Sequence, residues 1–357
     1  MKRYYTRACN FYYGTLSKNL IKKKLALPLC GNKEIAFDKI EIFTRDNKNI
    51  SSKIISIKKI NFLNSIIKSK IKKDIQKITS KRTILNKFTN YNEPLIMGIL
   101  NMTPDSFSDG GKYIHIKNAL KKISLMIEAG AKIIDVGGES TRPGAKTISP
   151  ESEWKRVEKV IKVFKKKYSN ILLSIDTRKS KIMYKALKNK VDIVNDVSGF
   201  SHDAESLKKI KNKNVWKVIH HMQGTPKTMQ LNPKYDNALL DIYDFFEEKL
   251  SSQFTNIKYL NKIILDPGIG FGKNLKHNLM LLSKISLFHS LGFPILIGTS
   301  RKKFISDISG TYDSKERIGG TLSSVLFTLS QGVQIFRVHD VLEIKQGILV
   351  YKRLLNQ

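Results

Sequence analysis

The chain has 357 residues, 41% of them hydrophobic, and a mean hydropathy of −0.26, so it can build the core of one large domain or two ordinary ones. No apolar run approaches the roughly 18 residues that a membrane-spanning helix needs. The net charge of +34 suggests nucleic acid, but only 11 of the 64 basic residues are Arg and the excess runs along the whole chain, which disfavours that partner. We therefore expect neither a nucleic-acid nor a membrane partner.

Residues 1–93 differ from the rest and are interpreted as an N-terminal extension, a small β-containing segment followed by a Lys/Ile-rich linker. Short half-buried strands are predicted by alternating apolar residues at Ile35–Phe37, Ile40–Ile42 and Ile55–Ile57. Residues 58–92 contain a single acid, Asp74, and are read as helix or linker, with a solvated connector favoured. The basic, acid-free start of the chain leaves organellar targeting as an alternative. The two cysteines favour a reducing compartment, so a cytoplasmic location is expected.

From residue 94 to residue 357 apolar, strand-like runs alternate with helical patterns. The strands are predicted at Leu95–Asn101, Lys132–Gly138, Ile171–Asp176, Asp192–Asp196, Val215–Met222, Ile263–Asp266, Pro294–Thr299 and Val333–His339. The clearest helices are predicted at Ile116–Ala129, Pro150–Lys167, Asn237–Gln253, Lys315–Gln331 and Val341–Leu354. Continuous apolar strands separated by helices predict a parallel sheet, and eight such units favour a closed (β/α)8 TIM barrel of the α/β class.

Polar and Gly-rich sequences follow every predicted strand, at the end where a barrel of this kind holds its active site. Asp176, Asn195 and Asp266 offer carboxylates and an amide that suit a planar heterocycle with several N–H groups. Thr141, Arg142, Arg337 and His339 offer a hydroxyl and cations that suit an anion, above all phosphate. Lys302, directly after an apolar strand, is long enough to reach the barrel centre.

Two further motifs are only weak evidence, one for a nucleotide-binding loop and one for a metal site. The segment GIGFGK (268–273) fits neither a phosphate-binding loop nor a dinucleotide fingerprint, because its glycine spacing and the residue after the lysine are wrong. The pair His220 and His221 suggests a metal, but no HExxH motif or Cys cluster accompanies it.

Two longer motifs, GILNMTPDSFSDGG (98–111) and IIDVGGESTRPGA (133–145), resemble those of the dihydropteroate synthases. The segments SIDTRK, IVNDVSG, HMQGTPKTMQ, LDPGIGFGK, GTSRKKF and RVHDV agree in order and spacing. The resemblance covers residues 94–357, the whole predicted barrel. It implies a folate-pathway transferase and sulfonamide target that joins 6-hydroxymethyl-7,8-dihydropterin pyrophosphate to p-aminobenzoate, releasing pyrophosphate and forming 7,8-dihydropteroate.

The resemblance also implies roles for individual residues. The pterin ring would be bound by Asp176, Asn195, Asp266 and Lys302. Pyrophosphate would be bound by Asn101, Thr141, Arg142, Arg337 and His339, with Mg²⁺ beside Asn101. The aminobenzoate would lie among Phe107, Pro143, Phe271 and Ser300, with Asp109 over the reacting centre. Asp109, Asp176 and Lys302 would be the catalytic residues, and the family usually forms homodimers.

The chemistry of these residues suits a dissociative reaction, in which cations and Mg²⁺ draw pyrophosphate away and nearby carboxylates stabilise the resulting pterin methylene cation. Another pterin-binding barrel, such as a methyltetrahydrofolate methyltransferase, is the alternative, but it has no use for an anion site. One residue departs from the family pattern: Lys303 stands where Ser is usual, beside the expected aminobenzoate site.

Overall fold

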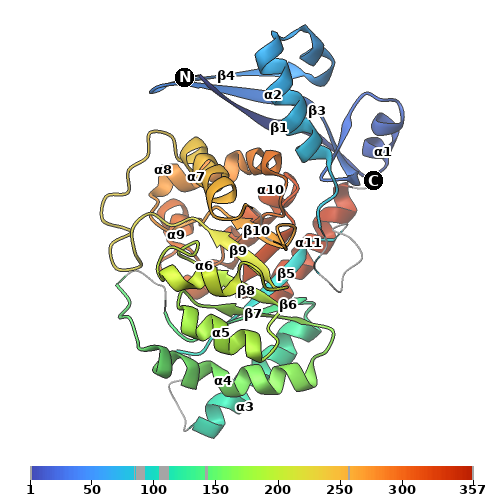
Figure 1. Cartoon of the computed structure of the whole chain (residues 1–357). Helices are drawn as coiled ribbons and strands as arrows, with labels where there is room; N and C mark the ends of the chain where they lie inside the picture. The colour runs from blue at the N-terminus through green and yellow to red at the C-terminus, as the bar shows by residue number, and fades with distance from the viewer. Residues whose placement is uncertain are drawn as a thin grey trace.

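The computed structural model describes residues 2–83, 85, 93–103, 112–140, 144–255 and 258–355, with residues 112–115 described by their backbone alone. Within these ranges the chain forms a parallel barrel surrounded by helices and a separate antiparallel sheet from the first part of the chain (Figure 1).

The barrel contains eight parallel strands in the order β10-β9-β8-β7-β6-β5-β12-β11. The strands are β5 (Leu95–Asn101), β6 (Ile133–Gly137), β7 (Leu172–Asp176), β8 (Ile193–Asp196), β9 (Trp216–His220), β10 (Ile263–Asp266), β11 (Leu296–Ile297) and β12 (Ile335–Val338). A parallel bridge between Leu265 and Ile295 joins the two outer strands and closes the ring. The predicted (β/α)8 barrel is therefore confirmed.

Helices cover the outside of the barrel because each strand is apolar on both faces. They are α3 (Lys112–Glu128), α4 (Pro150–Lys167), α5 (Ser180–Lys188), α6 (Ala204–Ile210), α7 (Ala238–Ser252), α8 (Leu275–Ser283), α9 (Lys303–Ser309), α10 (Ile318–Leu329) and α11 (Val341–Leu355), with short 3₁₀ turns η3 (Ile285–Leu291) and η4 (Ser314–Glu316). Helix α4 begins as predicted: the Ser149 hydroxyl accepts a hydrogen bond from Ser152 N, and Pro150 occupies the first turn.

Most predicted boundaries hold to within two residues, and β5, β10 and α4 match at both ends. The strand predicted at Pro294–Thr299 is the shortest, because Ile295 N donates to the Gln334 side chain rather than to a neighbouring strand. The helix predicted at Lys315–Gln331 is divided into η4 and α10 at Arg317, whose guanidinium binds the carbonyls of Thr311 and Arg301.

The first part of the chain forms its own sheet. Its elements are β1 (Arg3–Tyr13), α1 (Gly14–Lys22), β2 (Leu27–Leu29), β3 (Asn32–Asp46), β4 (Asn49–Ser56), η1 (Ile57–Phe62) and α2 (Ser65–Thr79). The long strand β3 pairs antiparallel with the other three. One sequence expectation is corrected here: the expected solvated connector includes α2, which buries Ile71 and Ile78 against the sheet. The basic start of the chain, for which the sequence predicted no element, is a sheet strand paired with β3 from Arg3 to Tyr13.

This sheet and α2 pack against the barrel beside α7 and η3 (Figure 1). Arg45 forms ion pairs with Asp241 and Asp244 of α7. Glu41 receives hydrogen bonds from Arg7 and Lys284, each at 2.7 Å. Burial raises the pKa of the Glu41 carboxyl, but these two cationic donors outweigh it and leave the pKa lowered. The extension is thus tied to the barrel by charged side chains that are mostly withdrawn from solvent.

Leu85 closes the end of the barrel at which the strands begin. Its side chain is fully buried in the cluster that fills the barrel interior, together with Leu95, Ile133 and Ile335. These neighbours lie at the amino ends of their strands, so Leu85 occupies the end of the barrel opposite to the strand ends that carry the polar motifs.

We predict that Leu85→Ala lowers the free energy of unfolding by about 2–5 kcal/mol, because it opens a cavity in a packed interior. Leu16→Ala is the matched control: that side chain is 55% exposed, and a change within about 0.5 kcal/mol is expected. Urea unfolding of both variants measures the difference. Equal midpoints for the two variants would show that Leu85 does not close the barrel.

Candidate active site

A half-buried cation lies between two buried carboxylates at the carboxyl ends of the strands. Arg337 of β12 donates from Nε to Asp135 of β6 at 2.7 Å and from Nη2 to Asp176 of β7 at 2.8 Å. Both acids are nearly inaccessible. Burial raises the pKa of Asp176 to about 8, although the charge of Arg337 opposes the rise. Three strands of the barrel therefore converge on one charged group.

Asn195 extends this group along the next strand, because its side-chain amide donates to Asp135 at 3.1 Å. Three buried oxygens here, Oδ1 of Asp135, Asp176 and Asn195, have no hydrogen-bond partner among the described residues. Buried acceptors of this kind are costly unless a donor reaches them. The arrangement is therefore suited to a ligand that presents several N–H groups.

Asp135 was not among the sequence-predicted site residues. The signal that could have found it is the period-two alternation of β6, in which Ile133 and Asp135 face the barrel interior while Ile134 and Val136 pack outward. A carboxylate on the interior side of a barrel strand, near its carboxyl end, is a site candidate by position alone.

Asp266 ends β10 on the other side of the mouth. Its Oδ1 accepts a hydrogen bond from Gly268 N at 2.8 Å, and its Oδ2 lies 3.8 Å from His220 Nε2. Burial raises the pKa of Asp266, and the nearby Lys302 ammonium opposes the rise. Gly268 has φ +69°, and a Cβ there would lie 1.9 Å from the His221 carbonyl oxygen, so only glycine fits this turn.

Lys302 reaches toward Asp266 from the start of α9. Its ammonium donates to the Ile269 carbonyl and lies 4.4 Å from the centre of the Phe271 ring. Burial lowers the pKa of Lys302 to about 7, and the Asp266 carboxylate partly offsets this effect. Phe271 in turn packs edge-on against His220, with 4.6 Å between ring centres. An aromatic ring and a titratable amine thus share one wall of the mouth.

Lys273 is a second residue that sequence reasoning missed. It is 2% exposed, and its ammonium donates to His221 Nδ1 at 3.0 Å and to the Phe271 carbonyl at 2.9 Å. Burial lowers the pKa of Lys273 well below its usual range. The lysine of GIGFGK therefore holds the turn that carries Phe271, which the search for a nucleotide motif could not reveal.

The last two strand ends are tied together by side chains. Ser300 Oγ lies 3.0 Å from His339 Nδ1 and accepts a hydrogen bond from His339 N at 3.2 Å. Arg301, the residue after Ser300, has φ +61° and forms a two-pronged ion pair with Asp340. This pair holds the turn that presents Ser300 and Lys302.

The structure brings together seven of the predicted site residues: Asp176, Asn195, Asp266, Phe271, Ser300, Lys302 and Arg337. His339 joins them through Ser300, and Asn101 lies half-buried at the end of β5. Five others, Phe107, Asp109, Thr141, Arg142 and Pro143, lie outside the described residues. Lys303 points to solvent, its side chain 83% exposed and paired with Asp307.

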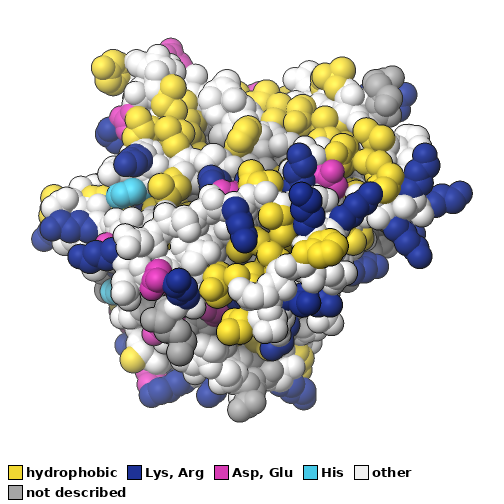
Figure 2. Space-filling model, turned by 90° about the horizontal axis from the view of Figure 1, so that it is seen from above, with side chains coloured by type: hydrophobic (Ala, Val, Ile, Leu, Met, Phe, Trp, Pro, Cys, Tyr) yellow, Lys and Arg dark blue, Asp and Glu magenta, His cyan; other side chains and the backbone are white. Residues whose placement is uncertain are grey.

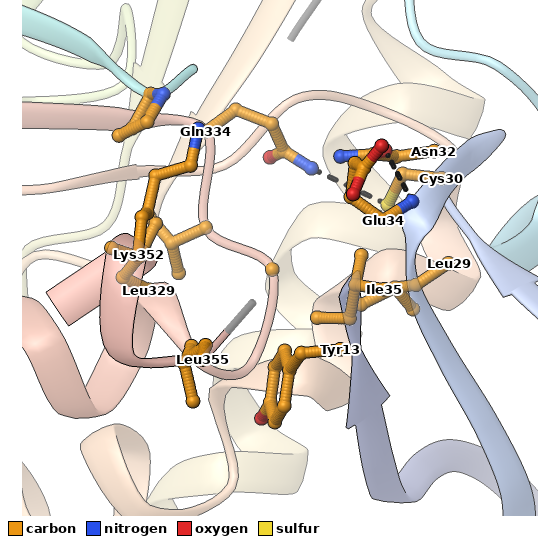
Figure 3. A pocket seen from close by; sticks show the side chains of 13 residues that line it. Tyr13, Leu29, Cys30, Asn32, Glu34, Ile35, Leu329, Gln334, Lys352 and Leu355 are labelled. Carbon is orange, nitrogen blue, oxygen red and sulfur yellow. Dashed lines mark hydrogen bonds between the residues drawn. The ribbon is translucent and has the colours of Figure 1, made fainter. Parts of the chain in front are cut away.

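A separate cavity of about 90 Å³ lies away from this mouth (Figure 3). Its walls come from the extension, from the start of β12 and from α11, and they include Tyr13, Ile35, Gln334 and Leu355. Gln334 precedes β12, so the cavity adjoins the amino ends of the strands. Apart from the single amine of Lys352, its lining holds none of the cationic residues that an anion site needs, and none of the predicted site residues.

We predict that Lys302→Met stabilises the protein more at pH 6 than at pH 10. The folded-state pKa of about 7 lies below the ordinary 10.5, so the cost of burying the charged amine is full below pH 7 and disappears as pH rises toward 10.5. After loss of the contacts with Ile269 and Phe271, a net gain of about 1–3 kcal/mol is expected at pH 6.

The matched control is Lys303→Met, the exposed neighbour, for which a change within about 0.5 kcal/mol is expected at both pH values. Chemical unfolding at pH 6 and pH 10 measures both variants. A stability difference for Lys302→Met that is the same at the two pH values would contradict a strained, buried amine.

Comparison with known proteins agrees with this geometry. A family described as pterin binding enzyme matches residues 97–339. The dihydropteroate synthase of Escherichia coli is 41% identical over 263 residues, which cover 74% of this chain and 92% of the relative. That of Neisseria meningitidis is 40% identical and covers 73% and 93%.

Solved structures give the same result. The Yersinia pestis dihydropteroate synthase, in a sulfonamide drug complex, is 35% identical with a TM-score of 0.71 and covers 77% of this chain and 99% of that one. The Xanthomonas albilineans enzyme with 4-aminobenzoic acid is 32% identical with a TM-score of 0.70 and covers 75% and 95%. The match with the family begins at residue 97, after the extension. The chain belongs to the dihydropteroate synthase family of pterin-binding enzymes.

Proposed function

We infer that the chain condenses 6-hydroxymethyl-7,8-dihydropterin pyrophosphate with p-aminobenzoate to give 7,8-dihydropteroate and pyrophosphate, a transferase reaction of folate biosynthesis. The observation that carries this function is the group formed by Arg337 and the buried Asp135, Asp176 and Asn195, whose three acceptor oxygens lack partners among the described residues. The relatives named above are dihydropteroate synthases, and one solved structure holds 4-aminobenzoic acid.

The pterin ring is assigned to Asp176, Asn195, Asp266 and Lys302, with Asp135 added from the structure. A pterin presents ring and exocyclic N–H groups in one plane, and carboxylates bind such groups through paired hydrogen bonds. The partnerless oxygens of this group and the buried position of Asp266 support the assignment.

Pyrophosphate is assigned to Asn101, Thr141, Arg142, Arg337 and His339. Arg337 supports this assignment because it is bound to Asp135 and Asp176, two of the acids assigned to the pterin ring. A guanidinium has five N–H donors, and two hydrogen bonds go to Asp135 and Asp176, so donors remain for a phosphate oxygen. One side chain can thus orient the acids that bind the ring and neutralise the leaving group.

The aminobenzoate is assigned to Phe107, Pro143, Phe271 and Ser300, with Asp109 over the reacting carbon. The support among the described residues is Phe271, whose ring is held in place by the perpendicular ring of His220 and by the ammonium of Lys302. A fixed aromatic face of this kind suits a flat aromatic amine.

The proposed reaction is dissociative. Pyrophosphate departs with the electron pair of the C–O bond, and the methylene cation that remains is delocalised over the pterin ring. The carboxyl groups of Asp135, Asp176 and Asp266 surround the ring position with acceptor oxygens, whose potential favours the cation over the neutral substrate. The amine nitrogen then forms the C–N bond and loses a proton. No nucleophilic side chain is required.

Mg²⁺ is proposed as the cofactor, with the Asn101 side-chain oxygen as its protein ligand. The described residues contain no group of three or more His, Cys, Asp or Glu side chains that could hold a metal by themselves. This fits Mg²⁺, which commonly takes one or two protein oxygens and completes its shell with water and substrate phosphates. When bound, the ion would neutralise charge on the departing pyrophosphate.

A homodimer is proposed from exposed apolar side chains on neighbouring helices. Leu342, Leu349 and Val350 of α11 share one helical face, and Phe327 lies on the adjacent α10; all four are at least 48% exposed.

We expect a particle of twice the chain mass of 40.8 kDa in sedimentation equilibrium, and a 40.8 kDa particle at micromolar concentration would contradict the proposal.

No helix in the described part of the chain is long and apolar enough to cross a membrane. On the face seen in Figure 2, Lys and Arg side chains are spread from edge to edge among hydrophobic ones.

We propose a cytoplasmic location. Cys9 and Cys30 are free thiols, which supports this location, and cell fractionation tests it.

We predict that the purified chain releases pyrophosphate only when both substrates and Mg²⁺ are present, and that Asp176→Ala and Lys302→Ala lower kcat/KM by at least about 10³-fold. A coupled pyrophosphate assay measures this, with excess EDTA as the metal control and Lys303→Met as the protein control. A sulfonamide is expected to compete with aminobenzoate. Turnover at the normal rate with Arg142 and Arg337 both replaced by Ala would overturn the anion site.

A further inference from the structure

A buried cluster of charged side chains lies outside the group that faces the substrates. It consists of Glu139, Glu153, Thr177, Arg178 and Lys179, each less than 9% exposed, and we call it the loop-base cluster. Its members come from the segments after β6 and β7 and from α4. No role in the reaction has been given to any of them above.

Lys179 is the centre of the loop-base cluster, because all three of its ammonium donors have partners. They bind Glu139 at 2.8 Å, Glu153 at 2.7 Å and the Ile148 carbonyl at 2.7 Å. Two carboxylates from different segments and one loop carbonyl are thus joined at a single nitrogen.

Glu139 and Arg178 connect the two ends of one loop. Glu139 Oε1 accepts a hydrogen bond from Ile148 N at 3.1 Å, and Glu139 Oε2 accepts one from Arg178 Nε at 2.9 Å. Arg178 also donates to Thr147 Oγ1 at 3.1 Å. Burial raises the pKa of Glu139, but the hydrogen bonds from Arg178 and Lys179 outweigh it, so the carboxylate stays charged. The segment between residues 139 and 148 is therefore clamped at its base.

The same cluster fixes the strand end that carries Asp176. Thr177, the next residue, donates its hydroxyl to Glu153 at 2.6 Å, and its backbone N–H binds the Asn195 carbonyl. At the start of the loop, Gly138 lies so close to α4 that an added Cβ would be 2.9 Å from the Glu153 carbonyl oxygen. The loop base and the strand end are thus held against one helix.

We propose that the loop-base cluster is a positioning device that holds the described parts of the loop after β6, residues 139–140 and 144–148, against the end of β7, so that the pyrophosphate and the pterin ring are held in register. The loop contains Thr141 and Arg142, and the strand end contains Asp176, so this inference rests on the proposed function. Lys179 is the positioning residue that joins the two.

The chemistry of the cluster supports positioning rather than stability. A buried ion network contributes little net stability, because the cost of removing the charges from water cancels most of their attraction. What such a network specifies is geometry, since each donor has one direction and one partner. The side-chain hydrogen bonds of the cluster reach loop backbone, loop side chains and one helix, and within the described residues none joins a cluster side chain to Asp135, Asp176, Asp266, Lys302 or Arg337. The backbone N–H of Thr177 binds the Asn195 carbonyl, and burial and, to a smaller extent, the charge of Glu153 raise the pKa of Asp176.

The test compares the full-length wild type with Lys179→Met and with the double variant Lys179→Met/Glu139→Gln. The single variant leaves buried carboxylates without their cation and is expected to lose stability. The double variant removes one of those charges, so its melting temperature is expected to recover toward wild type, while the loop base loses both the Lys179 ammonium and the Glu139 carboxylate. Lys162→Met, which breaks an exposed ion pair with Glu158 on the same helix, is the control.

Two affinities are measured on each protein: KM for the dihydropterin pyrophosphate in the coupled assay, and Kd for 6-hydroxymethylpterin, which lacks pyrophosphate, by fluorescence. For the double variant we expect KM to rise about 10- to 100-fold, with Kd within about twofold of wild type. Unchanged values of both, or a parallel weakening of both, would overturn the proposal. A wild-type protein that forms no dihydropteroate would instead refute the proposed function.

Discussion

The position of Arg337 between Asp135 and Asp176 is the interaction on which the site depends. The two acids lie on adjacent strands, and the arginine reaches them from β12, which is separated from β6 by β5. Two carboxylates could not be buried side by side without this cation, because their repulsion and loss of hydration would favour protonation or unfolding. The barrel must therefore be closed and in register before the acids can be charged. Closure of the barrel in turn depends on the bridge between Leu265 and Ile295 and on the apolar packing of Leu85 at the amino ends of the strands.

The extension contributes to that closure from the opposite end. In a chain with 64 basic and 30 acidic residues, acids are scarce, and several of them are used where the extension meets the barrel. Asp241 and Asp244 hold Arg45, while Glu41 receives Arg7 and Lys284. These pairs are partly buried, so they position the sheet more than they stabilise it. Leu85 then follows the sheet and helix into the barrel interior, which makes the first part of the chain a structural part of the end at which the barrel strands begin.

The sequence predicted the barrel well because buried parallel strands leave a strong signal: an apolar run that stops at a polar residue. That signal places β5, β10 and the site residues Asn195 and Asp266. It fails for Asp135, which lies inside a strand, and for Lys273, whose role depends on a contact with His221 from another strand end. It also fails for β1, along which buried and exposed residues do not alternate regularly. Contacts between segments distant in sequence are what local patterns cannot supply.

The titratable groups of the site lie in surroundings that disfavour their charged forms. Burial raises the pKa values of Asp176 and Asp266 and lowers those of Lys302 and His220, so each of these groups is less favourable when charged than it would be in water. The surrounding packing supplies the energy that keeps them there, as is usual for functional sites. A ligand that brings N–H donors to the carboxylates relieves this cost on binding, and charge that develops on the ring relieves it further. In the proposed reaction, the same burial that weakens the folded protein therefore favours the charged transition state over the neutral substrate.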